Sequence, residues 1–215
     1  MGIESNCHSL LLQGWKGMWI EGFTSYYKQI MCRFAPIIRE GRLRELNEMI
    51  SVDNIDGIIK KYAENEELDL LSIDTDGNDW HVWKAKVSIR PRAVVIKYNG
   101  KLTPEIDYVM PYNKDHKWDH SDRFGASLKA LERLGREKGY QLVGTDLCGI
   151  NAFFVRQDLA KDFFALPATA ENLYNPARMN TIIYQNGHPA RNYIGTDVEG
   201  MEGVFEYYPD WKIIP

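Results

Sequence analysis

The segment Leu68–Asp79 (LDLLSIDTDGND) constrains the fold most, because a short apolar run leads directly into a cluster of carboxylates. An apolar run of this length, bounded by turn residues, is typical of a buried strand, here Leu68–Ile73. Arg92–Tyr98 (RAVVIKY) has the same character, and Gly77–Lys86 between the two is predicted to form a short helix. Strand, helix and strand in this order indicate a parallel pair joined by a right-handed crossover.

The rest of the chain extends this alternation. Its predicted elements are a helix over Glu4–Gln13, a strand over Gly17–Glu21, a helix capped by Thr24 and running to about Arg39, a strand over Leu43–Ile50, a helix from Asp53 or Asn54, a helix over Ser127–Lys138, and an antiparallel hairpin of Tyr140–Thr145 and Asn151–Arg156. Pro36 is expected to kink or shorten the second helix.

This pattern predicts an α/β domain over residues 1–158 with a mostly parallel sheet and a terminal antiparallel hairpin, the layout of the Rossmann-like methyltransferase fold. Residues 159–215 are rich in Asn and Tyr and punctuated by prolines. They are predicted to be an irregular C-terminal extension packed on the core. The long polar and aromatic connection Asn99–Asp122 breaks the alternation, and loops of this length in a compact domain are usually functional or mobile.

Composition narrows the classes of partner and compartment. A net charge of −4 and a pI near 5.8 argue against a dedicated nucleic-acid binder. The cysteines Cys7, Cys32 and Cys148 form no C-x-x-C pair, which fits reduced thiols in a cytoplasm. With no signal peptide and no apolar run long enough to span a bilayer, we expect a cytoplasmic protein without a membrane partner.

The polar residues that follow the predicted strands are the candidate ligand-binding groups, because ligands bind beyond the carboxyl ends of parallel strands. Glu21 is either a carboxylate that holds the ribose hydroxyls of a nucleotide-like cofactor or an ordinary solvent-facing acid. Ser51 and Val52 could flank an adenine ring, although a helix cap is the better explanation for the neighbouring Asp53.

The acidic sequence Asp74–Asp79 needs a cation, a cationic ligand or a helix to cap, because its carboxylates repel one another. A calcium loop is excluded by counting: aligning Gly77 with the loop glycine places Ser72 first and Trp83 last, where acids are required. Asp76 or Asn78 could cap the helix that follows. Asp74, at the strand end itself, is the residue most expected to face a ligand.

Two histidines of the long connection, His116 and His120, are candidates for contacting substrate as acids or bases. Their i, i+4 spacing suits a metal only in a helix, and no metal site is predicted. Asn99 and Trp118 of the same connection are further substrate-binding candidates. His81 is interpreted as an ordinary surface or core imidazole.

Several runs together, LLLQGWKGMWIEG, DLLSIDTDGND, PRAVVIKYN, FGASLKAL and NAFFV, resemble the FkbM-type group of S-adenosylmethionine-dependent methyltransferases over roughly Gly2–Asp158. The resemblance implies a small-molecule or sugar-like acceptor. Its implied cofactor-binding residues are Gly2, Glu4 and Asn6 in the remnant of the glycine loop, Glu21 at the ribose, Ser51 and Val52 at the adenine, and Asp74 at the methionine end. Asp76 and Asn78 would lie beside the acceptor, and Asp74 and the two loop histidines are the candidates to remove its proton.

Two departures from the family pattern matter. Relatives carry an apolar first strand and a glycine turn before Gly2, and that strand would lie between the strands of Glu21 and Asp74. Lys97 stands where relatives usually carry Glu. An alternative is therefore a truncated or non-catalytic protein that serves as a binding or structural module. A further possibility is a homo-oligomer in which another copy covers the open strand edge.

Overall fold

The computed structural model describes residues 5–63, 67–85, 88–118, 121–161, 163–164 and 166–178. Gly2, Glu4, His120 and most of the predicted C-terminal extension lie outside these ranges, so the predicted boundary at residue 158 stays a prediction. The chain divides into two compact units, an N-terminal unit (Met1–Glu66) and a C-terminal unit (Glu67–Pro215). Each contains its own sheet.

The N-terminal unit is built on two parallel strands, β1 (Gly17–Glu21) and β2 (Leu43–Asn47), in register from Gly17 opposite Leu43 to Glu21 opposite Asn47. Its core consists of Leu11, Ile30, Phe34 and Leu43, with Trp19 packed against them. The helices of this unit are α1 (His8–Leu12), α2 (Thr24–Arg33), α3 (Ala35–Arg39) and α4 (Ile55–Ala63).

The single helix predicted from Thr24 to Arg39 is wrong in two details. Phe34 leaves helical geometry between α2 and α3, and Pro36 lies in the first turn of α3, where its missing N–H costs nothing. Thr24 is not the cap: Phe23 holds the N-cap position, and the Thr24 hydroxyl donates instead to Asn47 Oδ1 (2.9 Å). This side-chain bond links the start of α2 to the end of β2.

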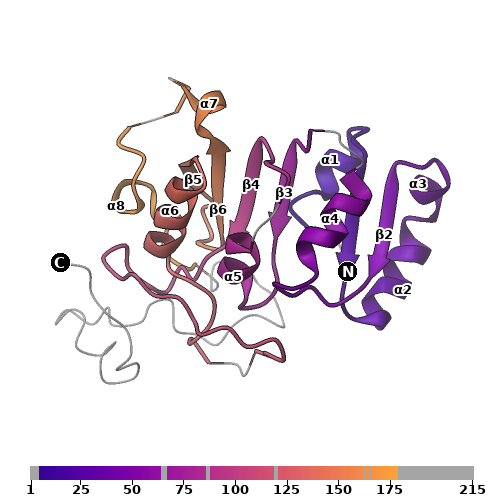
Figure 1. Ribbon diagram of the computed structural model, residues 1–215, viewed down its shortest axis with the longest axis horizontal. Coiled ribbons are helices and arrows are strands. Elements are labelled where there is room, and N and C mark those ends of the chain that lie inside the picture. Colours follow the sequence, from indigo (N-terminus) through magenta and orange to yellow (C-terminus); the bar gives the residue numbers. More distant parts are fainter. Residues whose placement is uncertain are drawn as a thin grey trace. The chain divides into compact units, whose positions relative to one another are not determined.

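The C-terminal unit contains a four-stranded sheet in the order β3-β4-β6-β5, with α6 packed against β5 (Figure 1). The strands are β3 (Leu70–Ile73), β4 (Ala93–Lys97), β5 (Tyr140–Thr145) and β6 (Asn151–Arg156). The helices are α5 (Asp79–Lys84), α6 (Leu128–Glu137), α7 (Gln157–Ala160) and α8 (Ala170–Leu173).

The pairing of these strands gives the sheet its direction. β3 and β4 are parallel, and β6 is antiparallel to both β4 and β5. β3, β4 and β5 therefore point the same way and β6 alone is reversed. The predicted α/β class and the hairpin of β5 and β6 are confirmed. Among the described residues, β1 pairs only with β2, and β3 only with β4.

Helix α6 buries Leu128, Leu131 and Leu134, and Ser127 is its N-cap, where Ser127 Oγ accepts the Ala130 N–H (3.2 Å). Gly135 is needed on its buried face, since a Cβ there would lie 2.7 Å from the Phe154 ring. Phe154 in turn packs against Trp83 of α5, with ring centroids 4.8 Å apart. The aromatic contact thus connects α5, α6 and β6.

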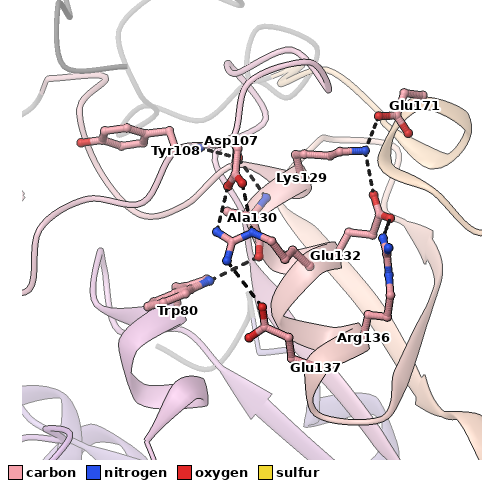
Figure 2. Close-up of polar contacts among 11 residues, drawn as sticks. Trp80, Asp107, Tyr108, Lys129, Ala130, Glu132, Arg136, Glu137 and Glu171 are labelled. Atoms are coloured by element: carbon pink, nitrogen blue, oxygen red, sulfur yellow. Dashed lines mark hydrogen bonds and ion pairs between the residues drawn. The ribbon is translucent and has the colours of Figure 1, made fainter. Parts of the chain in front are cut away.

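Helix α6 also carries a polar network, in which Lys129 and Arg136 donate to the buried Glu132 (Figure 2). Glu132 also accepts the backbone N–H of Ala170 (2.9 Å) at the start of α8. Arg133 of the same helix binds both carboxylate oxygens of Asp107 (3.0 and 3.2 Å) in the long connection. Helix α6 is therefore attached both to the C-terminal segment and to the connection Asn99–Asp122.

Across the described parts of the chain, none of the helices is both long enough and apolar enough to span a bilayer.

Glu132→Ala should lower the free energy of unfolding by about 2 kcal/mol, because it removes charged hydrogen bonds and leaves the Ala170 N–H without its acceptor. Urea denaturation measures the change. Glu137→Ala is the matched control: this carboxylate is 56% exposed on the same helix, so its loss should change stability by less than about 0.5 kcal/mol. Equal effects of the two substitutions would contradict the network.

Candidate functional site

The acidic loop Asp74–Asp79 lies where two parallel strands of the C-terminal unit end together. Ile73 of β3 is in register with Ile96 of β4, so Asp74 and Lys97 are the next residues on neighbouring strands. The loop turns sharply, with positive φ at Asp76 (52°) and Gly77 (140°). Helix α5 begins immediately after it. The loop is therefore a short, strained turn between a strand end and a helix start.

The side chain that stabilises this turn is the Asp79 carboxylate, whereas the sequence predicted a cap by Asp76 or Asn78. Its Oδ1 accepts the Thr75 N–H (2.8 Å) and its Oδ2 accepts the Gly77 N–H (3.0 Å). Asn78 occupies the N-cap position of α5, but its side chain makes no capping hydrogen bond. Asp79 is 1% exposed, so the hydrogen bonds that hold the loop lie on its buried side.

Lys97 binds the two outer carboxylates. Its Nζ lies 3.2 Å from Asp74 Oδ1 and 2.9 Å from Asp76 Oδ1. The lysine side chain is 16% exposed, whereas the Asp74 and Asp76 side chains are 52% and 72% exposed. The mostly buried Lys97 thus neutralises one of the two negative charges of Asp74 and Asp76. The exposed parts of these two carboxylates remain open to a ligand.

These positions shift two pKa values. Burial raises the pKa of Asp79 to about 6, and the negative charge of Asp74 adds to the effect; Lys97 and the two backbone N–H groups oppose it. Burial tends to lower the pKa of Lys97, but the surrounding Asp74, Asp76 and Asp79 raise it above its ordinary value. Lys97 is therefore a permanent cation, and Asp79 changes its protonation state close to neutral pH.

The long connection after β4 is closed at its base by buried polar contacts. Asn99 is 1% exposed, and its Nδ2 donates to the carbonyl oxygens of Asp122 (2.8 Å) and Phe124 (3.2 Å). Lys101 is also 1% exposed and forms an ion pair with Asp122. The connection therefore leaves and rejoins the fold at one fixed point.

The connection also brings His116 to the acidic loop. The imidazole lies against Gly77, where a Cβ would come within 2.7 Å of His116 Cδ2 and 2.8 Å of Nε2. His116 Nε2 and Thr75 Oγ1 are both buried, and neither has a hydrogen-bond partner in the described part of the chain. The predicted residues Asp74, Asp76, Asn78 and His116 are thus gathered around Gly77, with polar atoms still able to bond.

Three predicted substrate-binding residues have other partners in this structure. Asn78 donates to Asn113 O (2.8 Å), and Asn99 closes the base of the connection as described above. Trp118 is half-buried and donates to Ser121 O (2.9 Å). Their predicted contact with substrate stays a prediction. His120 lies outside the described residues.

The predicted cofactor residues that the structure describes in the N-terminal unit lie at the ends of its strands and helices. One Glu21 oxygen accepts the Phe23 N–H (2.8 Å). Ser51 Oγ accepts the Asp53 N–H (3.2 Å) in the turn before α4, Val52 is half-buried beside it, and Asn6 lies in the turn before α1. A groove of about 340 Å³ opens next to this turn, lined by Leu46, Glu48, Asp53, Asn54, Gly57, Ile58, Lys61 and Tyr62.

Sequence reasoning missed the roles of Asp79, Lys101 and Asn113. The spacing D-x-D-G-x-D carried a usable signal, because a carboxylate two residues after a glycine can accept the loop N–H groups. Nothing local marks Lys101 or Asn113, whose partners are 21 and 35 residues distant in sequence. In the described residues no group of three or more His, Cys, Asp or Glu is arranged to hold a metal.

Asp79→Asn should reveal the raised pKa of Asp79 as a change in the pH dependence of stability. The folded protein keeps a proton up to about pH 6 that the unfolded chain loses near pH 4, so Asp79 contributes stability below about pH 4 that is lost as the pH rises. From pH 4 to 6.5, the free energy of unfolding of the variant relative to wild type should therefore rise by up to about 3 kcal/mol.

Urea denaturation across this pH range measures the difference. Asp158→Asn is the control with the opposite sign, because hydrogen bonding to Arg156 lowers the pKa of Asp158. A difference between wild type and Asp79→Asn that is independent of pH would contradict the assignment.

Gly77→Ala should both strain the loop and push His116 away. At φ 140° and with His116 in contact, an alanine is expected to cost more than about 1 kcal/mol of stability. Gly57→Ala is the control, because a Cβ at this glycine in α4 would meet nothing within 4 Å and should stabilise the helix by about 0.5–1 kcal/mol. Thermal denaturation compares the two, and a neutral Gly77→Ala would contradict this geometry.

Comparison of the chain with protein-family models, curated proteins and solved structures found no match.

Proposed function

We propose that this chain is an S-adenosylmethionine-dependent methyltransferase of the Rossmann-like type that acts on a small-molecule or sugar-like acceptor. The observation that carries the proposal is the sheet order β3-β4-β6-β5, with β6 alone reversed and an acidic loop at the carboxyl end of β3. Ligands of α/β sheets bind at this end of the strands. The order also agrees with the resemblance to the FkbM-type group.

Each of the two units, taken by itself, offers groups of the chemical type that such a cofactor needs. Asp74 offers a half-exposed carboxylate for an ammonium group. Glu21 ends β1 with a carboxylate suited to hydroxyl groups, and the groove beside α4 has room for a purine ring. Thr75 Oγ1 and His116 Nε2 provide buried polar atoms that still need partners.

The chemistry assigned to each residue follows from these positions. The bound cofactor would supply an electrophilic methyl group on a sulfonium. Asp74 would hold the ammonium of the methionine end or the acceptor hydroxyl, and His116 would take the hydroxyl proton as the oxygen–carbon bond forms and the sulfur–carbon bond breaks to leave a neutral thioether. Lys97 would keep the acidic loop in place by binding Asp74 and Asp76.

A second candidate is a non-catalytic protein that keeps this scaffold without binding cofactor. It is favoured by the strand pairing, since among the described residues β1 and β3 are each hydrogen-bonded on one side only. It is also favoured by Lys97, which occupies the carboxylates that a cationic ligand would use.

Isothermal titration calorimetry with S-adenosylmethionine and S-adenosylhomocysteine tests the proposal. Wild type should bind both, and Asp74→Asn should weaken binding of both by at least about tenfold, the loss expected for one charge-assisted hydrogen bond. Asp158→Asn, a comparably exposed carboxylate bonded to Arg156, should bind like wild type. A folded wild-type protein that binds neither ligand would exclude the methyltransferase and leave the second candidate.

A further inference from the structure

Helix α5 and its N-cap hold the connection segment Met110–His116 through two side chains, Asn78 and His81. Asn78 Nδ2 donates to Asn113 O (2.8 Å), and the Asn113 N–H approaches Asn78 Oδ1 at 3.4 Å. His81 Nε2 lies 2.7 Å from Met110 O, and its ring packs edge-on against Tyr112 with centroids 5.4 Å apart. The two residues are three positions apart, so they lie on one face of the helix.

The contact at Asn113 reaches His116 directly. The carbonyl oxygen of Asn113 accepts from Asn78 Nδ2 and also from the backbone N–H of His116 (3.0 Å). One oxygen atom therefore fixes the His116 backbone to the N-cap of α5. The imidazole is then placed against Gly77, the residue immediately before Asn78.

Other contacts of this segment do not fix His116. Met110 is bonded to Gly125 (2.8 Å) at the start of the segment, but residues 111–115 are exposed to solvent. Within the described part of the chain, the side-chain bonds that join the middle of this segment to another element are those of Asn78 to Asn113, and His81 holds its start through Met110 O and the Tyr112 ring. An exposed segment without such an attachment would sample many positions.

We propose that Asn78 and His81 are positioning residues that set the location of the His116 imidazole over the acidic loop. The role of His116 as a base rests on the proposed function. The position of its imidazole is given by the contacts above and does not depend on that function. A base acts efficiently only within hydrogen-bond reach of the proton it removes, so a segment that moved freely would lose that geometry. The predicted substrate-binding residue Asn78 and the unassigned His81 thereby act through His116.

The test is the rate at which diethyl pyrocarbonate modifies His116 in the full chain, followed residue by residue by mass spectrometry without cofactor. His116 Nε2 is buried, so wild type should react slowly. Asn78→Asp keeps the shape but replaces the donor by an acceptor, and His81→Ala removes the bond to Met110. Each should make His116 react at least about fivefold faster, as expected for the loss of one fixing hydrogen bond.

His81→Gln restores a side-chain donor and should return the rate to near that of wild type. Asn172→Ala, which removes another side-chain bond to a backbone carbonyl, should leave His116 unchanged. An unchanged rate in folded Asn78→Asp or His81→Ala overturns the proposal. If Asn78→Asp does not fold, the comparison of His81→Ala with His81→Gln decides alone. Because no cofactor is used, failure to bind S-adenosylmethionine would not change this result.

Discussion

The candidate site depends on the closure of the connection Asn99–Asp122 by Asn99 and by the buried pair of Lys101 and Asp122. A buried ammonium is tolerated only when it is paired with an opposite charge. The ion pair of Lys101 with Asp122 therefore fixes the end of the connection next to its start. The Asn99 amide bonds to the Asp122 and Phe124 carbonyls and fixes the same point through the backbone. With both ends of the connection joined, its middle can be held by few contacts, because the entropy of closing the loop is already lost.

The acidic loop resolves its own repulsion in two ways that differ in their dependence on pH. Lys97 compensates Asp74 and Asp76 with a permanent charge, whereas Asp79 is compensated by two backbone N–H groups in a buried position. Burial and the charge of Asp74 raise the pKa of Asp79 by more than Lys97 and the two backbone N–H groups lower it, so the pKa stays raised. Lys97 therefore holds in place the loop that carries Asp74.

The regular elements were predictable because their signals are local. Gly17–Glu21, Tyr140–Thr145 and Asn151–Arg156 were predicted with the bounds they have, since apolar runs ended by turn residues determine them. The break at Phe34 was not, because helix continuity there depends on packing of Phe34 in the core. The bonds of Asn78 and Asn99 were not predictable either, because an amide that binds a carbonyl 23 or more residues away has no local pattern.

The acidic loop and the segment that carries His116 meet at Gly77 and Asn78. Gly77 donates its N–H to Asp79 and also provides the surface against which His116 lies, so the carboxylate and the imidazole share one backbone residue. Asn78, between Gly77 and Asp79, holds the segment that carries His116. Any change that weakens the bonds of Asp79 to Thr75 and Gly77 must therefore alter the surface under His116 as well. The acidic loop and the His116 imidazole therefore share the backbone of Gly77 and Asn78.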